Sequence, residues 1–236
     1  MFWRRILAWS VHLFTASGAI WGFLSILAIQ QHNWKAAIVW MAIAMFVDGF
    51  DGTLARRFDT KRLAASLDGA LLDNILDYLN YVLVPVLFLW EADFLPPASE
   101  LWVAIAILLA SAYQFTQVDA KTEDHYFKGF PCYWNVMVIY MLVLQLPPWV
   151  NLAFTIFFVV LIFVPVKYLY PSRTAFLRPV TLALTYAWAA LGVYGLILYP
   201  NVPEWLVNAS FVYVGYYVVA SLLPYLLSRR REEAAA

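Results

Sequence analysis

Long apolar runs separated by short polar breaks dominate the chain. A helix needs about 20 apolar residues to cross a bilayer. On that criterion the candidate spans cover residues 5–29, 34–55, 64–90, 99–118, 131–147, 150–168, 177–198 and 204–227. Segments rich in turn-forming residues separate the runs, among them QQHNWK, EADFLPPASE, LPPW and YPNVPE. The pattern predicts an all-α polytopic membrane protein with about eight transmembrane helices.

Composition agrees with a membrane protein. Hydrophobic residues make up 64% of the 236 residues and charged residues 13%, whereas soluble domains have about 45–50% and about 25%. Cys132 is the only cysteine, so an internal disulfide and a cysteine-based zinc site are excluded. The net charge is zero, so no nucleic-acid partner is expected. We expect one integral-membrane domain over residues 1–236, with a flexible C-terminal tail at 229–236.

The placement of Lys and Arg predicts the orientation. If the N-terminus is cytoplasmic, only Lys35 of the 15 basic residues falls on the outer side. The first apolar run exceeds the about 7–15 residues of a signal-peptide core, so we expect it to be retained as a span. Both ends are therefore predicted to be cytoplasmic, in a bacterial inner membrane. The acidic residues on the predicted outer side are Glu91, Asp93, Glu100 and Glu204.

Four aspartates interrupt the apolar pattern near the cytoplasmic side. Asp48 and Asp51 are three residues apart in the second span, and Asp73 and Asp77 are four apart in the third. Either spacing places a pair on one helix face. A carboxylate at the centre of a membrane helix costs about 2.5–3.5 kcal/mol, and such groups are usually functional. Four of them need cations to remain ionised, and oxygen-only ligands suit Mg²⁺ or Mn²⁺.

Small residues accompany these carboxylates. Gly49, Gly52 and Gly69 leave bare backbone beside the acidic positions. Close helix packing is one explanation, because small residues let membrane helices approach each other. Clearance for a phosphorylated ligand is the other. Arg56 suits a phosphate oxygen, but it also fits the positive-inside pattern.

The two acidic stretches, DGFDGTLAR and GALLDNILD, resemble the signature of the CDP-alcohol phosphotransferase family. That signature is D-x-x-D-G-x-x-A-R, a spacer, and G-x-x-x-D-x-x-x-D. The spacer here has twelve residues, Arg57 to Asp68, instead of the usual eight. The segments LLDNILDYLNYVLVP, DAKTEDHYFKGFPCYWN and VPVKYLYPSRT further resemble the bacterial branch of this family that makes phosphatidylcholine, in which the longer spacer is typical.

The resemblance implies transfer of the phosphatidyl group of CDP-diacylglycerol to choline, with release of CMP. It implies that Asp48, Asp51, Asp73 and Asp77 hold two divalent ions, Mn²⁺ or Mg²⁺, and that Asp77 is also the general base for the choline hydroxyl. Membrane lipids surround such an enzyme, and a homodimer is common in the family. The residues implied to line the CDP site are Thr15, Asp51, Gly52, Ala55, Arg56, Gly69 and Asp73.

Choline carries a trimethylammonium group, which proteins bind with aromatic faces and carboxylates. The cytoplasmic segment before the fifth span offers both, although aromatic residues also anchor helices at membrane interfaces. The candidates for choline are Asp124, Tyr126, Phe130, Tyr133 and Trp134. Basic residues that are candidates for the lipid phosphate, or simply follow the positive-inside pattern, are Lys121, Lys167 and Arg173.

Two alternatives remain open from the sequence. Another acceptor would make the protein a phosphatidylinositol, phosphatidylglycerophosphate or phosphatidylserine synthase. Intramembrane acids also mark the ion pathways of cation-coupled transporters. Transporters often contain inverted repeats, and no internal repeat is visible in this chain.

Overall fold

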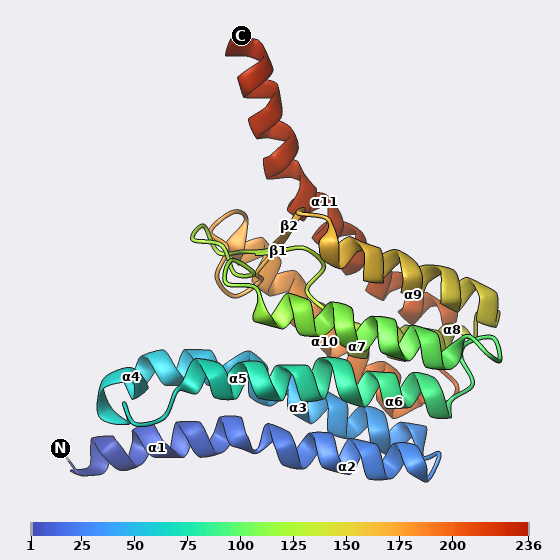
Figure 1. Ribbon diagram of the computed structural model, residues 1–236, viewed down its shortest axis with the longest axis horizontal. Coiled ribbons are helices and arrows are strands. Elements are labelled where there is room, and N and C mark those ends of the chain that lie inside the picture. Colours follow the sequence, from blue (N-terminus) through green and yellow to red (C-terminus); the bar gives the residue numbers. More distant parts are fainter. Residues whose placement is uncertain (1, 236) are drawn as a thin grey trace. The chain divides into compact units, whose positions relative to one another are not determined.

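The computed structural model describes the backbone of residues 2–235 and the side chains of residues 2–224. The side chains of the predicted tail at 229–236, including Arg229 to Arg231, lie outside the described part. Figure 1 shows a set of helices with one small sheet. The first helices are α1 (Phe2–Ala16), α2 (Gly18–Gln30), α3 (Trp34–Arg57), α4 (Thr60–Leu63) and α5 (Gly69–Tyr78). A π-helical turn, η1 (Leu79–Leu83), precedes α6 (Val84–Glu91), α7 (Glu100–Thr116), α8 (Trp134–Leu144), α9 (Pro148–Phe163), α10 (Arg178–Leu198) and α11 (Glu204–Ala235).

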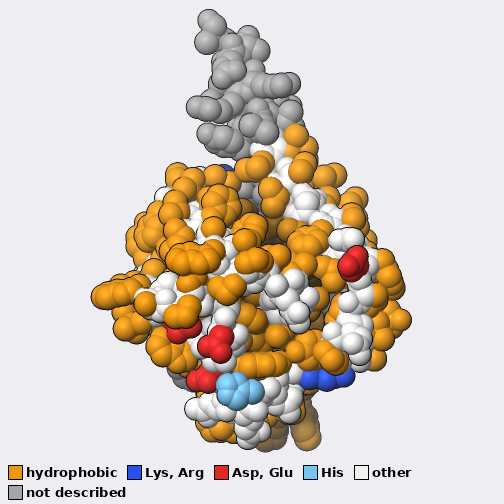
Figure 2. All heavy atoms as spheres, turned by 90° about the vertical axis from the view of Figure 1, so that its right-hand side faces the viewer, with side chains coloured by type: hydrophobic (Ala, Val, Ile, Leu, Met, Phe, Trp, Pro, Cys, Tyr) orange, Lys and Arg blue, Asp and Glu red, His pale blue; other side chains and the backbone are white. Residues whose placement is uncertain are grey.

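Helices long and apolar enough to span a membrane confirm a nearly all-α membrane architecture. Within the described residues these are Phe2–Gln30, Trp34–Arg57, Gly69–Glu91, Arg178–Leu198 and Glu204–Pro224. The helices α7, α8 and α9 are apolar but have only 17, 11 and 16 residues. Hydrophobic side chains predominate on the face shown in Figure 2, with a few acidic and basic residues among them. The count of eight spans and the orientation of the ends stay predictions.

Several predicted spans are longer than the helices that form; the span expected over 64–90, for example, is helical only from Gly69. The helix expected over 131–147 begins only at Trp134, because Pro131 and the left-handed backbone of Cys132 (φ 57°) precede it. It ends at Leu144, where Gln145 is also left-handed. The helix expected over 150–168 ends at Phe163, two residues before Pro165. Proline disfavours helical backbone at the residue before it, which explains this end.

The structure contains a small antiparallel sheet that was not predicted from the sequence. Strand β1 (Tyr126–Lys128) pairs with β2 (Lys167–Leu169), and Phe127 lies opposite Tyr168. Each strand has only three residues, which is too short for an alternating pattern to be visible. The pairing depends on two segments about forty residues apart, so the local sequence does not indicate it.

The chain forms two compact units. The first comprises Met1–Phe115 and Tyr133–Ala153, and the second comprises Thr116–Cys132 and Phe154–Ala236. All four aspartates belong to the first unit, whereas the sheet, α10 and α11 belong to the second. In the second unit α11 is tied to β2, because Ser221 Oγ accepts a hydrogen bond from Leu169 N at 3.0 Å.

In the first unit α1 packs against α3, α4 and α5, and α2 packs against α3 and α6. A buried Asn80 ties the third span to the first. Its Nδ2 donates to the Gly18 carbonyl at 3.2 Å and to the Leu76 carbonyl at 3.0 Å. Gly22 makes room for this amide, since a Cβ there would lie 2.6 Å from Asn80 Oδ1. Small residues thus bring the two helices together, as is common in membranes.

Candidate active site

Side-chain caps fix the start of both helices that carry the aspartates. Asn33 caps α3, where its Oδ1 accepts from Ala36 N at 3.2 Å. Asp68 caps α5, where one carboxylate oxygen accepts from Ala70 N and Leu71 N at 3.0 and 3.1 Å. Capping satisfies amide groups that would otherwise lack a partner in the first turn. Asp68 therefore fixes where α5 begins, five residues before its first predicted metal ligand.

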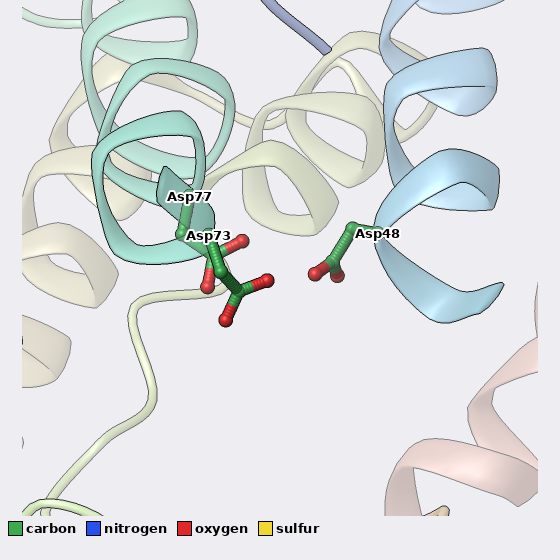
Figure 3. A group of neighbouring side chains, drawn as sticks. All are labelled: Asp48, Asp73 and Asp77. Atoms are coloured by element: carbon green, nitrogen blue, oxygen red, sulfur yellow. The ribbon is translucent and has the colours of Figure 1, made fainter. Parts of the chain in front are cut away.

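The carboxylates of Asp48, Asp73 and Asp77 converge between α3 and α5. One oxygen from each lies within 4.8 Å of the others, and all three side chains are partly buried. Figure 3 shows Asp73 and Asp77 extending from one helix toward Asp48 on the other. Ligands on opposite sides of an octahedral Mg²⁺ are about 4 Å apart. The oxygen-only donor set suits a hard divalent cation, which three carboxylates this close together could hold.

Asp51 lies beside this group but is not one of the three converging carboxylates. It is 7% exposed and lines the same pocket as Asp48, Asp73 and Thr15. The Thr15 hydroxyl donates to the Val11 carbonyl of its own helix at 3.3 Å, and Thr15 and Asp51 line the pocket together. The predicted set of four is thus split in this structure into three gathered carboxylates and a more deeply buried neighbour.

Tyr81 belongs to the site and was not identified from the sequence. Its hydroxyl donates to Asp48 Oδ2 at 2.6 Å, and it lines the pocket with Asp77. Tyr81 lies in the π-helical turn η1, which ends two residues before Pro85. Pro85 has no N–H, so it cannot donate the usual helical hydrogen bond to the Tyr81 carbonyl four residues earlier. Such π-helical turns are frequent at functional sites. The four-residue spacing from Asp73 to Asp77 continues to Tyr81, a signal that could have revealed it.

The long spacer between the two signature halves forms a short structured cap. It contains α4, and Thr60 is buried with its Oγ1 3.5 Å from the Ala55 carbonyl. Arg62 Nε donates to Asp59 Oδ2 at 2.6 Å, which closes the turn before α4. Through α4 the spacer packs against α1 and α3.

The three glycines in the two acidic stretches have different surroundings. A Cβ on Gly69 would lie 2.9 Å from His12 Cε1, so Gly69 is required by the imidazole ring itself. A Cβ on Gly52 would meet only the Arg56 guanidinium, at 3.4 Å, and one on Gly49 would meet nothing within 4 Å. Neither Gly52 nor Gly49 is therefore explained by helix packing among the described residues.

Replacing Gly52 by Ala tests whether a ligand approaches this backbone. We expect Gly52→Ala to fold normally, because only a flexible guanidinium must move and Ala favours helix. CMP formation should fall about a hundredfold, since a displacement near 1 Å at a reacting centre has that effect. Gly49→Ala is the matched control and should retain activity. Equal activity in the two variants would contradict clearance for a ligand at Gly52.

The predicted choline residues separate into different environments. Tyr126 and Phe130 are buried in the second unit, where Phe130 packs on Phe158 at 4.7 Å between centroids. Trp134 is fully buried in the first unit and donates its indole N–H to Ser111 Oγ at 2.9 Å. Tyr133 belongs to the first unit, like the aspartates, and its ring lies 6.5 Å from that of Tyr81.

Asp124 and Lys167, predicted to bind choline and phosphate respectively, form an ion pair with each other at 2.7 Å. Partial burial raises the pKa of Asp124, but hydrogen bonds from Lys167 and Thr122 outweigh this and hold it below its usual value. Arg173 lies over the Tyr170 ring at 5.7 Å. The backbone of Lys121 forms an isolated antiparallel β-bridge with that of Phe127. These residues all belong to the second unit, and their binding roles stay predictions.

Helices long and apolar enough to span a membrane, together with a cluster of carboxylates that could hold a metal ion, indicate an integral-membrane protein with a candidate metal site. Comparison with known proteins narrows this class. Residues 10–166 match the model of the CDP-alcohol phosphatidyltransferase family, which is more than half of the chain. The chain belongs to this family, whose members generally use divalent metals.

Relatives cover most of the chain. It is 46% identical to a phosphatidylcholine synthase of Legionella pneumophila over 91% of this chain and 87% of the relative. It is 43% identical to a phosphatidylcholine synthase of Borreliella burgdorferi over 76% of this chain and 77% of the relative. It is 41% identical to a phosphatidylcholine synthase of Pseudomonas aeruginosa over 77% of this chain and 76% of the relative.

Proposed function

We propose that this protein is a phosphatidylcholine synthase that transfers the phosphatidyl group of CDP-diacylglycerol to choline. The observation that carries the proposal is the convergence of Asp48, Asp73 and Asp77 within the signature of the family. Relatives named phosphatidylcholine synthase over most of the chain support choline as the acceptor.

In the proposed reaction Asp77 accepts the proton of the choline hydroxyl. The freed oxygen forms a bond to the phosphorus that carries the diacylglycerol, the bond from that phosphorus to the bridging oxygen breaks, and CMP leaves. Asp77 suits this role because its partly buried carboxylate lines the pocket. A general base must lie about 2.6–3.2 Å from the hydroxyl that it deprotonates.

Asp48, Asp73 and Asp77 are the proposed ligands of one divalent ion, Mn²⁺ or Mg²⁺, and Asp51 contributes to a second. Bound ions would neutralise charge on the diphosphate and on the departing CMP. Tyr81 holds the Asp48 carboxylate in place through its 2.6 Å hydrogen bond. Thr15, Gly52, Ala55 and Arg56 are proposed to line the CDP site around them.

The proposed topology keeps the eight spans and both ends cytoplasmic, in one domain over residues 1–236. The site then lies on the cytoplasmic side of a bacterial inner membrane. In that arrangement the lipid tails stay in the bilayer while choline enters from water. A homodimer is the proposed assembly, by analogy with other family members.

The decisive experiment is an acceptor screen with purified protein in detergent or lipid. Protein, CDP-diacylglycerol and Mn²⁺ should release CMP when choline is added, with formation of phosphatidylcholine. Inositol, serine and glycerol 3-phosphate are the comparison acceptors. CMP release with one of these and none with choline would refute the proposed function.

Tyr133 is the proposed aromatic contact for the choline ammonium, next to Tyr81. Each such contact contributes about 0.5–2 kcal/mol. We therefore expect Tyr133→Leu to raise the KM for choline about two- to thirtyfold, with little change in the KM for CDP-diacylglycerol. Tyr113→Leu, at an exposed site on α7, is the control. An unchanged choline KM in Tyr133→Leu would exclude this contact.

A further inference from the structure

His12 is a buried polar residue that the proposed reaction does not use. It lies on the buried face of α1 and is 6% exposed. Its Nε2 atom is buried and has no hydrogen-bond partner among the described residues. Buried polar atoms in proteins nearly always have a partner, and an exception in a native protein needs an explanation.

The position of His12 relates it to the signature. Its ring touches Gly69, the first residue of α5, one helical turn before Asp73. On α1 it lies one turn before Thr15, which lines the aspartate pocket. One turn is about 5.4 Å along the axis. His12 is therefore next to the carboxylate site, displaced by about one turn toward the start of α1 and α5.

Other signature residues lie in the same direction. The chain reverses between α2 and α3, so the C-terminal end of α3 lies beside the start of α1 (Figure 1). That end of α3 carries Ala55 and Arg56, about one turn beyond Asp51. The α4 cap packs against α1 at this same end. A ligand held at the carboxylates would extend past His12 if it continued toward α4.

We infer that His12 binds the nucleoside part of CDP through a hydrogen bond from or to its Nε2 atom. This inference rests on the proposed function, in which the diphosphate lies at the carboxylates. The nucleoside carries amino, carbonyl and hydroxyl groups, and an imidazole nitrogen can donate to or accept from these. The diphosphate would instead be held at the carboxylates, through the metal ions that they are proposed to bind. The absence of a side chain at Gly69 then serves ligand binding, because it leaves space for the His12 ring.

The test compares two probes that share a diphosphate but differ in the nucleoside. Binding of CDP and of inorganic pyrophosphate is measured in the presence of Mn²⁺ with wild type and His12→Phe. Phenylalanine keeps a ring against Gly69 and removes the nitrogen. We expect CDP to bind about tenfold more weakly to His12→Phe, as for one lost hydrogen bond, and pyrophosphate to bind equally well. The melting temperature without ligand should be equal or higher, because an unpaired buried atom has been removed.

Trp9→Phe is the matched control, since Trp9 contacts the edge of the His12 ring but is exposed. It should leave both affinities unchanged. Unchanged CDP binding in His12→Phe would overturn the inference and assign Nε2 a structural partner such as water. Equal weakening of both probes would also overturn it, because His12 would then act through the carboxylates. If wild type bound neither CDP nor CDP-diacylglycerol, the proposed function itself would fail.

Discussion

Asp77→Asn should lower choline-dependent CMP release by about a hundred- to ten-thousandfold, the range that a general base contributes. Asparagine keeps an oxygen that can face a metal ion but cannot accept the choline proton at neutral pH. Binding of CDP-diacylglycerol with Mn²⁺ should therefore persist in this variant. Single-turnover release of CMP and equilibrium binding of the lipid nucleotide are the two measurements.

Asp68→Asn is the matched control for this variant. It makes the same chemical change on the same helix, and asparagine caps a helix about as well as aspartate. Its activity should equal that of wild type. Normal turnover in Asp77→Asn would exclude Asp77 as the base. Loss of CDP-diacylglycerol binding there would instead show that Asp77 acts mainly as a metal ligand.

Removal of divalent ions should stop the reaction and also destabilise the protein. Three carboxylates within 4.8 Å of one another repel when no cation lies between them. Treatment with EDTA should reduce CMP release to background, and Mn²⁺ or Mg²⁺ should restore it. A ligand that binds only the folded state stabilises it, by about 2.7 kcal/mol at a hundred times its Kd. The melting temperature should therefore rise with added Mn²⁺.

The double variant Asp48→Asn/Asp73→Asn tests whether the Mn²⁺ that stabilises the protein binds at the carboxylate cluster or elsewhere. Its melting temperature should not respond to Mn²⁺, because two of the three converging carboxylates are gone. Activity that survives complete chelation would remove the metal from the mechanism. A Mn²⁺-dependent rise in the double variant equal to that of wild type would place the ion elsewhere.

Local patterns were sufficient for the class of protein and for the candidate carboxylates. Apolar length identifies membrane helices because lipid leaves no other way to satisfy backbone polar groups. Spacings of three and four place side chains on one helix face regardless of the rest of the fold, which is why Asp73 and Asp77 point the same way in Figure 3. The specific spacing of the signature supplied the family, which the comparisons confirm.

Other features could not be predicted because they depend on contacts between distant segments. The small sheet pairs strands about forty residues apart, and Trp134 proved to be a core residue only once Ser111 was placed beside it. Asp51 looked equivalent to Asp48 along the chain. Only the packing of the helices separates them, since Asp51 is buried at 7% exposure and Asp48 converges with Asp73 and Asp77.

A polytopic membrane protein with carboxylates at helical spacing could be predicted from the amino-acid sequence, since both properties follow from one segment at a time. The neighbours that complete the site depend on how the helices pack against each other. The π-helical turn before Pro85 brings Tyr81 to Asp48, and the packing of α1 on α5 sets His12 against Gly69. The physical reason is that helical periodicity fixes the direction of a side chain relative to its own helix. What it meets there depends on how the other helices pack.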